Sequence, residues 1–525
     1  MHGVFPIHIA MSQQQLLAVV NIIESVTHME SGTGPEIPEN PSVRNDKRPV
    51  LVWFRGDLRL SDHPALSWAV HTGRPVVPVF VLDDSAGVYP GEASRWWLHG
   101  SLQALNTSLE HLGSRLILRR GPPVKALMTL VRETGAAAIA WSRQYDPAGS
   151  LQGTQVQAWC DRTGIESRSF NASLLIEPWD ISTGSGLPYR VFTPFWRRCL
   201  ARAFEPPQSE KPVPAPPDSW PVSEKLEEWR LRSAHPDWAA GLRKTWQPGE
   251  EGAWNRLDSF LREGFVHYHR HRDQPGRDGT SMLSAHLHFG EIGPRQIVAA
   301  LDALEPGPGL DAFMRQIGWR EFCHHLLFHN PDMETASLRP EFDRMPWRDS
   351  PADLRRWQLG QTGYPLVDAG MRELWTTGWM HNRVRMITAS FLTKHLLIDW
   401  RLGADWFLDT LVDADRANNS AGWQWVAGCG TDAAPYFRIF NPVTQSKRFD
   451  PSGRYLRTWL PELRRLPDQV IHTPWSAPRT VLADAGVRLG KNYPRPAVDH
   501  AQTRLRALEI YETRIRSGPG KAPPG

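Results

Sequence analysis

The residues with the clearest chemical potential lie between Gly378 and Gly428. This stretch reads GWMHNRVRM at 378–386, IDWR at 398–401 and DADRANNSAGWQW at 413–425. It places one cation, Arg385, and two acids, Asp413 and Asp415, beside amide side chains and repeated tryptophans. Unpaired charges are costly to bury, so these groups suit simple core packing poorly. Charged, amide and indole groups in alternation suit a large, planar, phosphate-bearing redox cofactor.

A second polar segment, RDGTSMLSAHLHFGEI at 277–292, precedes an apolar-periodic helical pattern. Thr280, Ser281 and Ser284 lie where this helix would begin. Hydroxyls and free backbone N–H groups at a helix N-terminus form a natural phosphate site. An ordinary helix cap explains the same residues, so this motif is weak when taken alone.

The segment around Arg385 is stronger evidence for a site. On a helix, Asn382, Arg385 and Met386 are three and four residues apart and share a face. Arg385 can pair with Asp413 or with Asp415, and such a pair could also bond the polar edge of a ring. A purely structural salt bridge is the alternative. The amides and indoles of ANNSAGWQW, directly after the acids, favour the site.

The first part of the chain alternates between strand and helix patterns. Apolar strands are predicted at 50–55, 76–82, 115–120, 137–142 and 166–170, and helices at 64–71, 94–112, 123–134 and 150–163. In helix 94–112 the leucines at 102, 105, 109 and 112 share one face, and Gly113 ends it. Apolar strands alternating with helices predict an α/β domain with a Rossmann-like parallel sheet covered on both faces.

The character of the chain changes after Pro206. The segment 205–221 holds seven prolines in 17 residues, as in an extended linker. Beyond Trp246 the strand patterns nearly vanish, which predicts an all-α domain with helices at 250–263, 294–304, 310–329, 364–377, 380–398 and 403–412. The expected division is a flexible N-terminal extension (1–47), an α/β domain (48–180), an interdomain linker (181–245), a helical cofactor-binding domain (246–512) and a short tail (513–525).

Composition limits the class of protein. The chain has 525 residues, a formal net charge of +4 and four cysteines without metal-ligand spacing. We therefore expect a reduced, cytoplasmic protein without a metal ion. No apolar run approaches the ~18 residues needed to span a membrane. A monomer without an obligatory protein partner is the simplest expectation.

Seven motifs resemble those of the DNA photolyase and cryptochrome family, from about Pro49 to Tyr511. They are WREF (319–322), TGYPLVDAGMREL (362–374), TGWMHNRVRM (377–386), DWR (399–401), DADRANN (413–419), GWQW (422–425) and RIFNP (438–442). Details such as RQIGWREF and WQWVAGCG look closest to the class III cyclobutane-dimer photolyases. The resemblance implies an α/β domain joined by a long linker to a helical FAD domain.

The resemblance also implies a set of FAD-binding residues. Tyr268 and the segment Thr280, Ser281, Met282, Leu283 and Ser284 would hold the phosphates. Arg385 would bridge to Asp413, with Ala414 and Asp415 alongside, and Phe313 stands where many relatives have Trp. Asn419 would face flavin N5 and stabilise the reduced flavin. A methenyltetrahydrofolate antenna is expected from class III relatives, although no motif specifies it.

Three tryptophans match the family's electron relay. Trp423 would lie nearest the flavin, Trp400 next, and Trp347 near the surface. Oxidisable indoles in a row divide one long electron transfer into short hops. Trp357, Trp375 and Trp379 could provide a branch, and the sequence does not order the routes.

The substrate residues implied by the resemblance surround a flipped pyrimidine dimer; photolyases are themselves a known case of base flipping. Trp319 and Trp425 would form walls and Met386 a floor, while Asn382 and Arg383 would contact polar edges and phosphate. Arg272 would contact the DNA backbone, and Lys447 and Arg448 are further candidates. The (6-4) type has His at the position of Asn382, which argues against (6-4) repair.

Two residues depart from the family pattern. Gln316 replaces a Glu that hydrogen-bonds the thymine in many cyclobutane-dimer enzymes, and an amide cannot supply a proton. Arg416 stands where Leu is common, and we expect it on the surface.

The function expected from these residues is light-dependent repair of cyclobutane pyrimidine dimers in DNA by electron transfer from excited, reduced FAD. A cryptochrome-like blue-light photoreceptor is the alternative. About 14 residues follow Tyr511, whereas plant cryptochromes carry long tails and place Asp at the position of Asn419, so both features favour repair. A non-catalytic flavin-binding DNA protein is possible only if Gln316 disables repair.

Overall fold

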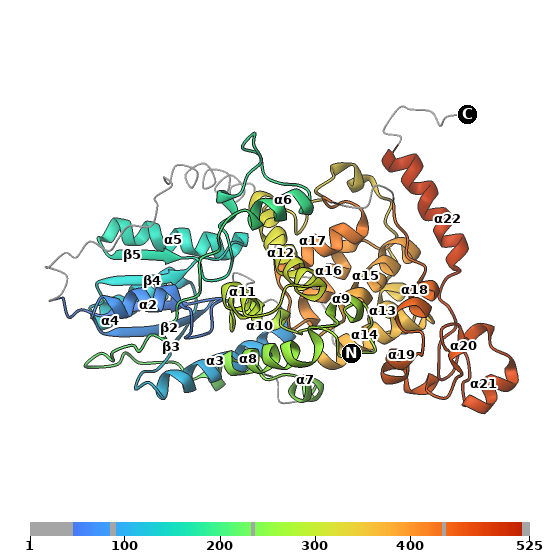
Figure 1. Ribbon diagram of the computed structural model, residues 1–525, viewed down its shortest axis with the longest axis horizontal. Helices are drawn as coiled ribbons and strands as arrows, with labels where there is room; N and C mark the ends of the chain where they lie inside the picture. Colours follow the sequence, from blue (N-terminus) through green and yellow to red (C-terminus); the bar gives the residue numbers. More distant parts are fainter. Residues whose placement is uncertain (1–45, 85–90, 233–236, 433–436, 517–525) are drawn as a thin grey trace.

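The computed structural model describes residues 46–84, 91–232, 237–432 and 437–516, and shows an α/β part beside a larger helical part (Figure 1). Five parallel strands form one sheet in the order β3-β2-β1-β4-β5. The strands are β1 (Val50–Phe54), β2 (Val76–Leu82), β3 (Ile117–Arg120), β4 (Ala138–Ser142) and β5 (Glu166–Phe170). The chain order reverses direction between β1 and β4, as in doubly wound folds. The predicted Rossmann-like parallel sheet is confirmed.

Alternate residues of each strand pack against different helices. Val50, Val52 and Phe54 join the core formed with α2 (Pro64–His71) and α3 (Glu92–Glu110). Leu51 and Trp53 join the core formed with α4 (Pro123–Thr134) and α5 (Pro147–Thr163). Both faces of the central strands are therefore buried, which explains why their sequences are continuously apolar.

The observed helix ends lie closer to capping residues than to the ends predicted from the apolar patterns. The α5 helix begins at Pro147, earlier than predicted, because the Asp146 side chain accepts a hydrogen bond from the Gly149 N–H (2.9 Å). The α3 helix ends at Glu110, two residues earlier than predicted, and Gly113 follows with a φ of 74°. Side-chain capping at N-termini is a local interaction that hydrophobic periodicity does not report.

The segment predicted to be a linker contains two α-helices in the part that the structure describes. They are α6 (Phe192–Leu200) and α7 (Ala240–Thr245). The α6 helix buries Phe192, Phe195 and Trp196 in a core shared with the helical part. The proline-rich stretch 205–221 has no helix or strand, because proline lacks an N–H donor and restricts its neighbours.

The rest of the described chain is helical, apart from a single bridge between Leu489 and Tyr493. The predicted all-α C-terminal part is therefore confirmed. Its α-helices are α8 (Glu250–Ser259), α9 (Tyr268–His271), α10 (Ser284–His288), α11 (Pro294–Asp302), α12 (Pro308–His329), α13 (Pro351–Gln358), α14 (Pro365–Thr377), α15 (Asn382–Ser390), α16 (Trp400–Thr410), α17 (Arg416–Ala427), α18 (Pro442–Phe449), α19 (Arg454–Trp459), α20 (Asp468–Ile471), α21 (Arg479–Ala485) and α22 (His500–Ile510).

Wider turns extend three of these helices. The π-helical segments Phe260–Gly264, Phe391–Leu396 and Tyr511–Arg516 follow α8, α15 and α22. The last of them continues helical structure into the predicted tail; residues 517–525, like 1–45 of the predicted extension, lie outside the described residues. None of the described helices is both long enough and apolar enough to cross a membrane.

A buried carboxylate joins the two parts of the molecule. Glu291, from the helical part, accepts hydrogen bonds from the Trp97 indole on α3 (2.9 Å) and from the Gly249 N–H (2.7 Å). Its other oxygen lies 2.5 Å from a ring nitrogen of His286. These bonds satisfy a fully buried charge and fix α3 against the start of α8.

Candidate active site

The centre of the candidate site is the ion pair between Arg385 and Asp413. One guanidinium nitrogen of Arg385 donates to both carboxylate oxygens of Asp413, at 2.8 and 3.0 Å, and its Nε donates to the Met380 carbonyl at 2.7 Å. The Asp413 side chain is 4% exposed and that of Arg385 is 23% exposed. The second terminal nitrogen of Arg385 has no acceptor among the described residues, so it remains available to a ligand.

Asp415 does not pair with Arg385, although the sequence allowed a pair with either acid. It caps α17, because one carboxylate oxygen accepts the Asn418 N–H at 2.8 Å. The other oxygen lies 3.4 Å from a ring nitrogen of His324 and 4.0 Å from one of His288. Burial raises the pKa of Asp415, but the two histidines and Arg320 outweigh it and hold that pKa well below its ordinary range.

Asn419 lies one turn into α17, with its backbone N–H bonded to the Asp415 carbonyl at 2.8 Å. Its side-chain N–H donates to the Ala404 carbonyl of α16 at 3.1 Å. No donor from the described part of the chain reaches its side-chain oxygen. A fixed, half-buried amide with an unused acceptor is the kind of group that could accept a hydrogen bond from a flavin N–H.

The predicted phosphate segment has one residue in the left-handed region, Met282, with a φ of 52°. The backbone N–H groups of Ser281 and Met282 bond to no acceptor in the residues that the structure describes. Ser284 is exposed, whereas Leu283 is buried in the core. Two free N–H groups with neighbouring hydroxyls fit a phosphate ligand, but α10, which follows, has only five residues.

The two predicted aromatic cofactor residues contact one another. The Tyr268 and Phe313 rings lie 5.4 Å apart and nearly perpendicular, and both pack on Phe260. Burial raises the pKa of Tyr268, so this phenol stays protonated. Together with the free groups on Arg385, Asn419 and the 281–282 backbone, these residues have the donors and acceptors that FAD requires.

Of the three predicted relay tryptophans, the outermost is the least buried. Trp423 and Trp400 are fully buried, and Trp347 is partly buried. The tip of the Trp423 ring packs against Gly403 of α16, one turn beyond Trp400; an added Cβ at Gly403 would lie 2.1 Å from that ring. A backbone hydrogen bond joins the segments that carry Trp347 and Trp400: the N–H of Arg348, which follows Trp347, donates to the carbonyl of Leu397, three residues before Trp400 (2.7 Å).

The possible branch residues fall into separate places. Trp357 is buried 6.1 Å from the Trp423 ring, at 68° to it. Trp375 is 62% exposed and stacks on Trp406. Trp379 lies near the Arg385 guanidinium, at 6.0 Å. Of these three, Trp357 is the one that the structure places against a relay tryptophan.

The two predicted walls of the substrate pocket are linked through a single acid. Trp319 stacks on Phe192 at 3.9 Å, and the Phe192 N–H donates to the Asp432 carboxylate at 3.3 Å. The Trp425 indole donates to the backbone carbonyl of the same Asp432 at 3.0 Å. Phe192 and Asp432 were missed from the sequence: Phe192 lies 127 residues before Trp319, and Asp432 belongs to none of the recognised motifs although it is only seven residues from Trp425.

Polar residues at the predicted pocket edge form a chain of contacts. Arg272 donates to the Gln316 side-chain oxygen at 3.0 Å, and Arg383 donates to Asp273 at 2.9 Å. Another Arg383 nitrogen lies 3.8 Å from the Met386 sulfur. Asn382, at the first position of α15, is exposed, as are Lys447 and Arg448 on α18. Asp273 was also missed, although it directly follows Arg272.

The expected surface position of Arg416 is wrong. Its side chain is 21% exposed and forms an ion pair with Glu334. Burial raises the pKa of Glu334, and Arg416 opposes this rise. A cation at the first position of α17 lies at the unfavourable end of the helix dipole, so the nearby carboxylate compensates it.

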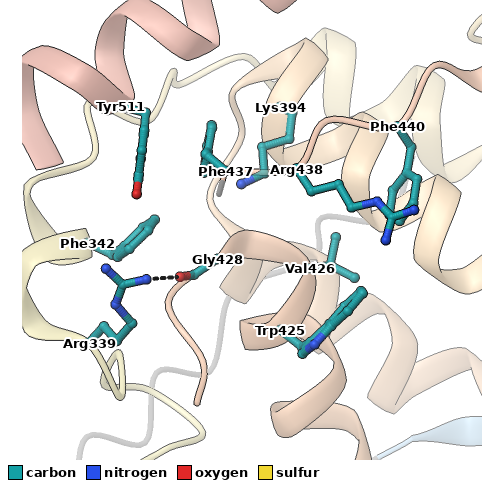
Figure 2. Close-up of a pocket in the computed structure, with 10 residues that line it drawn as sticks. All are labelled: Arg339, Phe342, Lys394, Trp425, Val426, Gly428, Phe437, Arg438, Phe440 and Tyr511. Atoms are coloured by element: carbon teal, nitrogen blue, oxygen red, sulfur yellow. Dashed lines mark hydrogen bonds between the residues drawn. The ribbon is translucent and has the colours of Figure 1, made fainter. Parts of the chain in front are cut away.

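A small pocket lies at the carboxyl end of α17, and Trp425, Val426 and Gly428 are among the residues that line it (Figure 2). Two basic side chains bond carbonyls at that helix end: Lys394 donates to Ala427 at 2.5 Å and Arg339 donates to Gly428 at 3.3 Å. The Lys394 amine also lies 3.2 Å from the centre of the Phe437 ring. These contacts give the pocket a structural role, because they satisfy carbonyls that a helix C-terminus leaves without partners.

Comparison with known proteins supports the family expected from the motifs. Residues 50–217 match the DNA photolyase family model, and residues 313–513 match the model of the FAD binding domain of DNA photolyase. A deoxyribodipyrimidine photo-lyase of Agrobacterium fabrum is 49% identical over 468 residues, which are 88% of this chain and 97% of that protein. Cryptochrome-2 of Arabidopsis thaliana is 40% identical over 493 residues, which are 90% of this chain and 80% of that protein.

The solved structures agree with the sequence comparisons. A bacterial class III photolyase from Agrobacterium tumefaciens superimposes with a TM-score of 0.88 at 47% identity, covering 92% of this chain and all of that one. A Sulfolobus tokodaii photolyase, described with two FAD molecules, superimposes with a TM-score of 0.74 at 28% identity, covering 88% of this chain and 99% of that one. This chain therefore belongs to the DNA photolyase and cryptochrome family and carries that family's FAD-binding domain.

Proposed function

We propose that this chain is a light-driven lyase that repairs cyclobutane pyrimidine dimers in DNA. The observation that carries the proposal combines two features: the Arg385–Asp413 pair with Asn419, whose fixed amide has an unused oxygen, and Trp319 and Trp425, which are linked through Phe192 and Asp432. The first feature suits a reduced flavin, and the second suits flat bases. The similar photo-lyase of Agrobacterium fabrum supports the same activity.

Bound and reduced FAD would supply one electron to the dimer on excitation, and the dimer would return it after splitting. The chain's own residues bind and orient. Arg385 and Asn419 hold the ring edge, and the backbone at Ser281 and Met282 holds phosphate. Trp423, Trp400 and Trp347 would carry electrons from the surface to restore the reduced cofactor.

The residues around the pocket would recognise the lesion. Trp319 and Trp425 would offer flat walls to an extruded dimer, and the thioether of Met386 an adaptable floor. Asn382 would bond polar base edges, and Arg272 and Arg383 would bond phosphates. Because phosphate contacts release counterions, affinity for DNA should fall as salt rises. Affinity that ignored salt would contradict this assignment.

The decisive experiment is repair of an oligonucleotide that contains one thymine dimer, by the reduced holoenzyme, in light and in the dark. We expect dimer loss only in light. The Trp423→Phe variant provides a control: prepared in the reduced state it should still repair, whereas its photoreduction from the oxidised state should be lost. Repair in the dark, or none in light, would contradict the proposal.

A cryptochrome-like photoreceptor is the second candidate, favoured by the 40% identity to Cryptochrome-2 over 90% of this chain. Its distinguishing outcome is bound FAD with normal photoreduction and no dimer repair. Under either function a methenyltetrahydrofolate antenna remains a prediction, which the absorption of cofactor released from the purified protein would test.

A further inference from the structure

We infer that Asp273 is an internal competitor for a DNA phosphate at the mouth of the pocket, weakening DNA binding and speeding release. The inference rests on the proposed function, because it takes DNA as the ligand. It assigns a role to an acid that the repair chemistry does not use.

One carboxylate oxygen of Asp273 faces two arginines. Arg383 donates to it at 2.9 Å, and the Arg272 Nε lies 4.0 Å away. The side chains are 38% exposed for Asp273, 25% for Arg272 and 20% for Arg383. A phosphate oxygen from solvent can therefore reach the same two guanidinium groups and would meet the carboxylate there.

Each arginine has contacts besides the one with Asp273. Arg272 bonds the Gln316 side chain at 3.0 Å, and its guanidinium lies 5.5 Å from the Tyr268 ring centre. The Arg383 guanidinium lies 4.6 Å over the Phe449 ring. Asp273 therefore shares the positioning of these arginines with other contacts, and what it adds beyond them is a negative charge.

The position of this charge connects it with the lesion pocket. Gln316 precedes Trp319 by one turn of α12, and Arg383 contacts Met386 on α15. Gln316, which also contacts Arg272, is neutral. The negative charge that offsets the positive charges of the two arginines therefore comes from Asp273. Guanidinium groups bind phosphate through charge-assisted hydrogen bonds, which a neighbouring carboxylate weakens by competing for the donors and by repelling the phosphate.

Such competition has a use in a repair enzyme. Phosphate contacts provide affinity for any DNA sequence, damaged or not. Repaired DNA keeps all of its phosphates, so it leaves slowly if those contacts are too strong, and product release limits many enzymes. A carboxylate that reclaims the arginines favours departure of the product.

The test measures binding of labelled oligonucleotides to the holoenzyme in the dark, with and without one thymine dimer. We expect Asp273→Asn to bind both oligonucleotides roughly two- to five-fold more tightly at low salt, the range expected for an exposed ion pair. Dissociation should slow by a similar factor, and the advantage should shrink at high salt. Asp278→Asn is the matched control, since it removes one negative charge from an exposed position five residues later.

A double-mutant cycle separates competition from general charge effects. In an Arg383→Ala background, the gain in DNA affinity from Asp273→Asn should be largely lost, because the guanidinium that bonds Asp273 directly is gone. The inference is overturned if Asp273→Asn binds no more tightly than Asp278→Asn. Weaker binding by Asp273→Asn also overturns it, since that result means the carboxylate positions the arginines. If the unaltered protein binds neither oligonucleotide, the proposed function itself fails.

Discussion

The Arg272 guanidinium donates a 3.0 Å hydrogen bond to the side-chain oxygen of Gln316, and the Gln316 amide N–H donates to the Ala312 carbonyl at 3.3 Å. Both ends of this side chain therefore have partners before any substrate binds. The amide has a second N–H, which bonds no acceptor among the described residues, so Gln316 can donate to a thymine without giving up either bond.

Restoring the acid should be tolerated. In Gln316→Glu the carboxylate would form an ion pair with Arg272, a charge-assisted bond stronger than the present one. We expect repair per absorbed photon to stay equal or rise, measured as dimer loss under steady illumination. Gln316→Ala removes the amide and both of its hydrogen bonds, so this variant should repair the dimer less efficiently. Abolished repair in Gln316→Glu would refute the placement of this residue at the lesion.

The Arg385–Asp413 pair should control FAD retention. Asp413→Asn removes the charge that holds Arg385, so we expect roughly ten- to a hundred-fold weaker FAD binding, the loss expected for a charged hydrogen bond. Flavin absorbance of the purified protein during dilution measures it. Asp353→Asn breaks the Arg348–Asp353 pair elsewhere (3.4 Å) and should keep FAD. Equal retention by the two variants would contradict the assignment.

Asn419 should control the protonation of half-reduced FAD. Asn419→Asp replaces the amide by a group that can donate a proton, so photoreduction should accumulate a protonated one-electron-reduced flavin. Absorption spectra recorded during blue illumination would show it at longer wavelengths than in the unaltered protein. Identical spectra would mean that Asn419 does not face flavin N5.

Gly403 should be required for the packing of the inner relay tryptophan. Gly403→Ala places a Cβ 2.1 Å from the Trp423 ring and 2.6 Å from Leu392, and such overpacking costs about 1–3 kcal/mol. Gly422→Ala, in the neighbouring α17, meets nothing within 4 Å and should instead gain roughly 0.5–1 kcal/mol. Urea unfolding of both variants checks the contrast. Equal stability would show that the Trp423 ring is not held against α16.

Glu373 should give the protein a specific dependence of stability on pH. Burial raises its pKa from 4.5 to about 7, against opposing hydrogen bonds from Tyr455 (2.6 Å) and the His381 N–H (3.3 Å). The folded state therefore holds this proton where the unfolded state has lost it, so the contribution to stability falls as pH rises from 4.5 to about 7 and is level above that.

The variant Glu373→Gln should remove this dependence, because the amide keeps both hydrogen bonds and cannot ionise. We expect its free energy of unfolding, relative to that of the unaltered protein, to rise by up to about 3 kcal/mol between pH 5 and pH 8. The free energy of unfolding in urea, measured for both proteins across that range, tests the difference. Parallel pH profiles would contradict the raised pKa.

Local features of the site could be predicted from the sequence because they depend on residues close in the chain. Asn382, Arg385 and Met386 share a face because α15 is a helix, and the buried strands were identified by their continuous apolar runs. The short helix α6 was missed although Phe192, Phe195, Trp196 and Cys199 are buried at helical spacing, because the prediction assigned the whole of 181–245 to a linker. The partly buried position of Arg416 was missed because its partner Glu334 is 82 residues away in the chain.

The sequence by itself determined the family, the parallel sheet, the helical half and the residues available for chemistry. These follow from local periodicity and from motifs, each encoded within a short stretch of chain. Only the tertiary structure decided that Arg385 pairs with Asp413 rather than Asp415, that Phe192 supports Trp319, and that Asp273 faces two arginines. Which charges and rings meet depends on how helices distant in sequence pack, and packing is set by the whole core.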